Sequence, residues 1–158
     1  MEARRADTVP DTYVQQRIHL VWSTRRRTAL LTDACRQALW PYLGGIFRHC
    51  DGVMLIAGGT EDHIHIYADY PKTLALSKFV NAIKSNSSRW IRETGAVSGE
   101  FHWQSGYGGF TVDKRGDKAL HEYIMNQEYH HKTMTFQEEY LRLLRRYDIP
   151  YDSRYVFD

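Results

Sequence analysis

The chain has 158 residues, of which 42% are hydrophobic and 25% are charged, and its formal net charge is +2. This balance is ordinary for a globular protein with a buried core, and no apolar run is long enough to predict a membrane span. Residues 1–12 are polar and lack the apolar stretch of a signal peptide, so we expect a flexible leader before a single domain over residues 13–158. Cys35 and Cys50 have no metal-binding spacing and indicate reduced thiols in a cytoplasmic protein.

The first half of the chain predicts three strands and one helix. Residues 12–23, TYVQQRIHLVWS, are rich in β-branched and aromatic residues and predict a strand. Thr32 is a typical N-cap for a helix to about residue 50, which Pro41 should kink or divide. GVMLIAGG (52–59) predicts a second strand, whose apolar continuity favours burial on both faces. The segment HIHIYADY that follows predicts a third strand.

The second half predicts a fourth strand among helices. An amphipathic helix follows Pro71 and should end near Gly95. FHWQSGYGGFTVDK (101–114) predicts a strand interrupted by glycines. We expect the next helix at about 117–131, and the capping box TFQE starts a last helix and tail over 135–158.

This order, β-α-β-β-α-β followed by two helices, predicts the fold class. It is the ferredoxin-like split βαβ pattern, an α+β fold with one antiparallel sheet and helices packed on one face. We expect the opposite face of the sheet to be free for a ligand.

His63 and His65 are the first candidates for chemistry. Side chains alternate along a strand, so the two imidazoles should share one face, and Asp62 should point away from them. Such a pair could hold a metal ion or could simply be polar residues on a strand, and the pair alone does not decide.

Tyr123 and Gln127 are the second candidates. They are four residues apart on the helix expected at 117–131, and therefore on one face. With the two histidines, the Gln127 oxygen could hold a divalent cation while Tyr123 attacks a phosphate. Alternatively, Tyr123 is a core aromatic beside Leu120 and Ile124.

Other polar residues are ambiguous. His19 could lie near the site or be a packed core residue. His130 and His131 follow Gln127 by three and four residues, so either could approach the site, although the surface is the more usual place for such histidines. Basic residues near aromatic side chains suit single-stranded nucleic acid but could equally form a solvated surface. The four candidates for DNA contact are Arg25, Arg26, Lys84 and Arg89.

The order of these motifs resembles one known family. HLVWSTRRR, EDHIHI, KSNSSRWIR, FHWQSGYGGFTV and YIMNQEYHH are similar, in this order, to segments of the single-tyrosine HUH transposases of small bacterial insertion sequences. That group includes the REP-associated tyrosine transposases, and the resemblance covers about residues 13–158.

The resemblance implies a function and a site. By it, Tyr123 is the nucleophile, and His63, His65 and Gln127 hold Mg²⁺ or Mn²⁺ without any organic cofactor. The expected substrate is single-stranded DNA with hairpin ends, cut through a 5′-phosphotyrosine intermediate by a homodimer. We expect a bacterial cytoplasmic protein that joins the nucleoid when bound to DNA. Two alternatives stay open: a non-catalytic hairpin-binding module, and a metal-dependent nuclease that uses water.

Overall fold

The computed structural model describes residues 13–157, and the leader expected at residues 1–12 lies outside them. Four strands form one antiparallel sheet in the order β2-β3-β1-β4. The strands are β1 (Arg17–Ser23), β2 (Val53–Gly59), β3 (His63–Asp69) and β4 (Gly108–Thr111). This order confirms the ferredoxin-like α+β fold. Within the described residues, no helix is long and apolar enough to cross a membrane.

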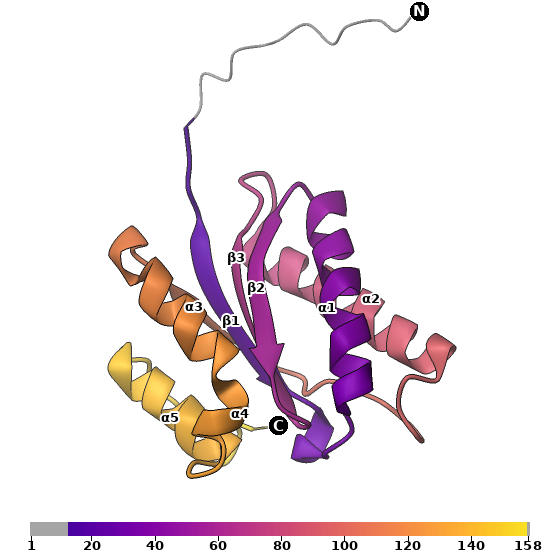
Figure 1. Ribbon diagram of the computed structural model, residues 1–158. Helices are drawn as coiled ribbons and strands as arrows, with labels where there is room; N and C mark the ends of the chain where they lie inside the picture. Colours follow the sequence, from indigo (N-terminus) through magenta and orange to yellow (C-terminus); the bar gives the residue numbers. More distant parts are fainter. Residues whose placement is uncertain (1–12, 158) are drawn as a thin grey trace, which may run out of the picture.

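Two long helices cover the apolar face of the sheet (Figure 1). They are α1 (Asp33–His49) and α2 (Leu76–Thr94). Alternation along β3 turns Ile64, Ile66 and Ala68 into this main core. Pro41 lies inside α1 and does not divide it, so of the two effects expected, a kink or a division, the division is wrong. Its ring is exposed, so the helical bond it cannot make is lost on the side that water can reach.

The opposite face of the sheet is also covered, so the expectation of a free face is wrong. Three helices lie against it in Figure 1: α3 (Asp117–Met125), α4 (Gln127–His130) and α5 (Phe136–Arg146). The last helix carries apolar residues at helical spacing, which must be buried somewhere. They form a second, smaller core with two sheet residues; its members are Val21, Phe110, Phe136, Tyr140 and Leu144.

Two further expectations need correction. The strand β2 has a helix on each face, as expected, but it lies at the edge of the sheet and is only partly buried, with Val53 55% exposed. The helix expected at 117–131 is interrupted at Asn126, between α3 and α4. Apolar continuity in β2 therefore reflects packing against α1 and α3, not a central position.

The fourth strand is much shorter than the 14 residues predicted. Residues before Gly108 follow the end of β1 through one isolated bridge, between Thr24 and Trp103, and through side chains rather than through a regular ladder. The Gln104 carboxamide oxygen accepts bonds from the Ser23 backbone N–H at 2.7 Å and from the Ser23 hydroxyl at 2.9 Å. The Lys84 ammonium donates to the backbone carbonyls of residues 104, 105 and 106 at 2.7, 3.2 and 2.7 Å. This segment is thus held in place without being a strand.

Candidate active site

The histidine pair lies on β3, a strand with neighbours on both sides, and both side chains are fully buried. Each Nδ1 atom already has a partner. His63 Nδ1 lies 2.6 Å from Asp62 Oδ1, and His65 Nδ1 lies 2.8 Å from His19 Nε2. Partners of this kind fix the orientation of a ring and leave its Nε2 atom for a ligand. His19 is therefore both a packed, buried residue and a neighbour of the site, so both possibilities left open by the sequence hold.

Asp62 does not point away from the histidines, so that expectation is wrong. It precedes the first residue of β3, where strand alternation does not yet apply. The Thr60 hydroxyl donates to the same carboxylate oxygen at 3.0 Å. The turn before the strand thus folds back and brings the Asp62 carboxylate to the His63 ring.

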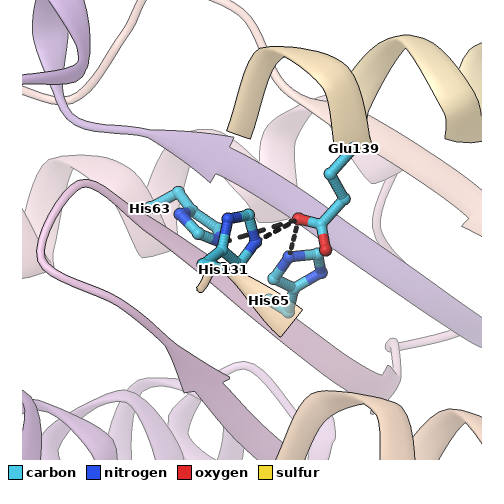
Figure 2. A group of neighbouring side chains, drawn as sticks. All are labelled: His63, His65, His131 and Glu139. Atoms are coloured by element: carbon cyan, nitrogen blue, oxygen red, sulfur yellow. Dashed lines mark hydrogen bonds and ion pairs between the residues drawn. The ribbon is translucent and has the colours of Figure 1, made fainter. Parts of the chain in front are cut away.

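The buried carboxylate of Glu139, from α5, is at the centre of the cluster. Its Oε1 lies 2.8 Å from His65 Nε2, 3.5 Å from His63 Nε2 and 3.1 Å from His131 Nε2 (Figure 2). Burial alone would raise the pKa of Glu139, but the imidazoles of His65, His131 and His63 hold it well below its usual value. The carboxylate therefore stays charged although it is almost inaccessible to water.

This donor set fits a divalent metal ion. One ligand atom from each of His63, His65, His131 and Glu139 lies within 4.8 Å of all the others. Imidazole nitrogens and a carboxylate oxygen are ordinary ligands of such ions. The Nε2 atom of His131 is buried and faces the same Glu139 oxygen as the other two imidazoles, at 3.1 Å. Of the two positions expected for His131, the structure therefore has the one at the site and not the one on the surface.

Gln127 borders the same cluster. Its carboxamide oxygen lies 3.1 Å from His63 Nε2, and its amide donates to Glu139 Oε2 at 3.3 Å. The amide also lies 3.4 Å from the Tyr123 carbonyl, so the two residues remain adjacent despite the break at Asn126. Gln127 is buried and can offer an oxygen to the centre of the cluster.

Tyr123 reaches the cluster from α3. Its hydroxyl donates to Glu139 Oε2, the carboxylate oxygen that does not face the histidines. Its ring is close to those of His65 and His19, with centroids 5.8 and 6.5 Å apart. Burial and the neighbouring Glu139 carboxylate raise the pKa of Tyr123 well above its usual value. The phenol is therefore protonated at neutral pH, and it is half-buried at a cavity rather than enclosed in the core.

The four basic candidates do not form one patch. Arg25 and Arg26 are exposed in a short 3-10 turn, η1 (Arg25–Arg27), after β1. Arg89 is exposed on α2 and donates to Asn86 at 2.8 Å. Burial lowers the pKa of Lys84, also on α2, to about 8. The helix α2 covers the face of the sheet opposite to Tyr123 (Figure 1), so contact of these residues with DNA stays a prediction.

Sequence reasoning missed Glu139. The residue lies in the first turn of a helix with a capping box, where acidic residues are common on electrostatic grounds alone. One signal was available: Glu139 lies on the same stripe as Phe136, Tyr140 and Leu143 at helical spacing. A carboxylate on an apolar stripe needs a buried partner, and here its partners are histidines.

Comparison with known proteins identifies the family. A family model described as "Transposase IS200 like" matches residues 12–127. The chain belongs to the IS200-like transposases. The match ends at Gln127, so His131 and Glu139 of this transposase lie beyond the matched residues. A search among curated proteins found no match.

Two solved structures share the fold of this transposase. One is a candidate transposase from Deinococcus radiodurans R1, with a TM-score of 0.59 and 21% identity, covering 75% of this chain and 95% of its own. The other is a REP-associated tyrosine transposase bound to a REP hairpin, with a TM-score of 0.57 and 16% identity, covering 83% of this chain and 74% of its own. Both likenesses agree with the α+β fold, and the family match confirms the resemblance drawn from the sequence motifs.

Proposed function

We propose that this transposase cuts and rejoins single-stranded DNA through a covalent bond between Tyr123 and a 5′ phosphate, with a divalent metal ion. One observation carries the proposal. The Tyr123 hydroxyl and three imidazole Nε2 atoms meet at the two oxygens of one carboxylate, that of Glu139. A nucleophile beside a buried cluster of metal ligands is the arrangement that attack on a phosphodiester requires.

The chemical step is a transesterification. The Tyr123 Oη atom forms a bond to the scissile phosphorus, and the bond from that phosphorus to the 3′ oxygen breaks. The phenolic proton is lost, and a proton ends on the departing 3′ oxygen, so the products are a 5′-phosphotyrosine and a free 3′ hydroxyl. The phosphodiester bond is exchanged rather than hydrolysed, and the reverse step can rejoin DNA without another energy source.

The candidate ligands for one Mg²⁺ or Mn²⁺ ion come from two sources, the family resemblance and the structure. His63, His65 and Gln127 are the ligands expected from the family resemblance, and the structure adds Glu139 and His131 to the available donors. When bound, the ion would supply positive charge for the phosphate oxygens and for the phenolate. Several imidazoles make a nitrogen-rich set, which favours Mn²⁺ over Mg²⁺.

The other residues orient and protect these groups. Asp62 and His19 fix the rings of His63 and His65. The Glu139 carboxylate accepts a hydrogen bond from the Tyr123 hydroxyl and so orients the phenol oxygen. The raised pKa of Tyr123 keeps the phenol protonated, and a bound cation would lower that pKa by stabilising the phenolate. Recognition of a DNA hairpin, and assembly as a homodimer, are part of the proposal on family grounds.

Tyr123→Phe tests the proposal directly. The change removes one oxygen and keeps the ring, so binding of hairpin DNA should change no more than a few-fold while the covalent adduct disappears. The measurement is a denaturing gel of protein incubated with single-stranded oligonucleotides and Mn²⁺, followed by mass spectrometry of the adduct. Tyr129→Phe is the matched control, because Tyr129 is 71% exposed on the next helix and should form the adduct at the parent rate.

The same experiment separates the alternatives. Cleavage without any adduct would favour a nuclease that uses water, and binding without cleavage would favour a non-catalytic module. A nucleotide attached to a residue other than Tyr123 would refute the assignment of the nucleophile.

A further inference from the structure

A groove leads from Tyr123 along α5 to the outside of the molecule. It is a cavity of about 770 Å³ between α3, α5 and the β1–β4 side of the sheet. The half-buried Tyr123 and the buried Glu139 both line it, so this cavity offers a phosphate a route to the phenol oxygen. Neither His131 nor any of the four basic residues predicted from the sequence lines it; its α5 side is formed by Glu139, Arg142, Leu143 and Arg146.

Two arginines of this groove have no assigned role. Arg142 and Arg146 follow Glu139 by three and seven residues, so they continue the stripe of α5 that faces Tyr123. Both are exposed, and neither makes an ion pair with a carboxylate of residues 13–157. Arg142 lies close enough to Tyr123, and Arg146 to His19, for their charges to act on these side chains.

The acidic residues of the groove do not cancel these charges. Glu139 is bonded to the histidines and Tyr123, and Asp113 is paired with Arg115 at 2.9 Å. Arg145, between the two groove arginines, does not line the groove and donates instead to the Tyr151 hydroxyl at 3.3 Å. The positive charge of α5 is thus directed into the groove at two positions only one helical turn apart.

An aromatic ring lies beside the arginines. Tyr147 is the residue after Arg146, and its ring packs on Phe110 with centroids 4.9 Å apart. Its hydroxyl donates to the Thr111 carbonyl at 3.2 Å, which fixes the ring, and 39% of the residue is exposed. A fixed, partly exposed ring next to free guanidinium groups is the combination that binds single-stranded nucleic acid, by stacking and by phosphate contact.

We infer that this groove holds the DNA strand next to the scissile phosphate, with Arg142 and Arg146 on successive phosphates and Tyr147 stacked on a base. Four residues of helix rise about 6 Å, which suits neighbouring phosphates of an extended single strand. The inference rests on the proposed function, since it takes single-stranded DNA as the substrate. It adds a binding site on α5, a helix that the family match does not cover.

Binding of an unstructured strand tests the groove without cleavage. The probe is a fluorescent thymidine oligonucleotide of about 20 nucleotides, long enough for one such site, measured by anisotropy with a chelator present. The double variant Arg142→Ala/Arg146→Ala should bind about tenfold more weakly, the scale of charged hydrogen bonds. Its slope of log K against log salt should fall in magnitude by about 1.4, for two phosphate contacts on a single strand.

Three variants complete the design. Arg145→Ala, which removes the same charge from a residue of α5 that does not line the groove, should bind within about twofold of the parent, because surface charge outside the groove is screened. Arg142→Lys/Arg146→Lys should keep most of the salt dependence, and Tyr147→Leu should weaken binding with an unchanged salt slope. The last two remain informative if the double alanine variant unfolds, which circular dichroism will show.

The outcomes separate this inference from the proposed function. Three results would each contradict the role of the groove in binding DNA. They are an undiminished affinity of the double alanine variant, an equal loss in Arg145→Ala, and no binding of the probe by the parent protein. Formation of a Tyr123 adduct by the parent protein is scored independently. A normal adduct with no effect of the groove variants would leave the nucleophile in place and refute the strand path alone.

Discussion

At the residue scale, one carboxylate joins three separate elements. Glu139 on α5 is bonded to His65 on β3, to Tyr123 on α3, and is next to His131 after α4. A buried charge is costly unless its partners are complete. Here the imidazoles offset the cost of burying the Glu139 carboxylate. A bound cation would stabilise this negative charge further.

Replacing this charge should weaken metal binding. In Glu139→Gln the shape of the side chain is kept while the negative charge is lost, so we expect affinity for Mn²⁺ to fall at least about tenfold. Isothermal titration calorimetry measures the change. Glu138→Gln is the matched control, because Glu138 is exposed and a glutamine can also complete the capping box with Thr135. Equal affinities of the two variants would remove Glu139 from the ligand set.

Lys84 should make stability depend on pH. Burial lowers its pKa to about 8 from the ordinary 10.5, so the folded state gives up this proton more readily than the unfolded state. Its contribution to the free energy of unfolding should therefore be greatest above pH 10.5 and be lost as the pH falls through about 8.

The measurement is a difference between two proteins. The free energy of unfolding is measured in urea for the parent and for Lys84→Met at pH 8 and pH 10. In the difference between the two proteins, the contributions of the other titrating groups cancel. The parent should gain stability relative to the variant as the pH rises, by less than about 1.4 kcal/mol per pH unit, because partial exposure screens the effect. A relative loss would mean that the three carbonyls hold the ammonium more strongly than burial opposes it.

At the scale of elements, the position of Tyr123 depends on close packing of α3 on β2. A Cβ atom at Gly58 would lie 2.5 Å from the Ile124 carbonyl oxygen, so only glycine allows this approach. Ile124 is the residue after Tyr123. The backbone of α3 is therefore held against the sheet next to Tyr123.

Gly58→Ala should push that helix outward. We expect a loss of about 1–3 kcal/mol in unfolding free energy, the cost of overpacking, together with slower adduct formation. Gly45→Ala is the control: its added methyl meets only the Arg48 guanidinium at 3.9 Å, and alanine in a helix should stabilise by about 0.5 kcal/mol. Chemical unfolding and the adduct assay measure both quantities, and unchanged values for Gly58→Ala would contradict the packing argument.

The elements themselves were largely predictable, and their contacts were not. Alternation and helical spacing are local properties, so they located β1, β3, α1, α2 and α5 and placed two histidines on one face. Whether β2 is an edge, or whether α5 returns to cover His65, depends on residues far apart in the chain. Glu139 is 74 residues from His65, and no local pattern connects them. The family resemblance supplied Tyr123 as the proposed nucleophile, but not the Glu139 carboxylate to which its hydroxyl donates.

At the scale of the whole molecule, the site is complete within one chain. Tyr123 reaches Glu139 and the histidines of its own sheet, because α3 and α5 pack side by side on the same face (Figure 1). A homodimer, expected from the family, would then contain two separate sites. The alternative, in which each Tyr123 completes the partner's site, requires α3 to leave the sheet, and the packing of Ile124 on Gly58 opposes that movement.

Mixing two defective chains distinguishes these assemblies. Heterodimers of a Tyr123→Phe chain with a His63→Ala chain contain one intact site only if Tyr123 acts in the partner. Because Tyr123 contacts Glu139 of its own chain in this structure, we expect no recovery of the covalent adduct in heterodimers purified through two different affinity tags. A parent chain paired with a Tyr123→Phe chain is the control and should keep about half of the parent activity, since one of its two sites is whole. Recovery in the doubly defective pair would show that α3 is exchanged between subunits, and the contact between Tyr123 and Glu139 would then describe a resting state of the single chain.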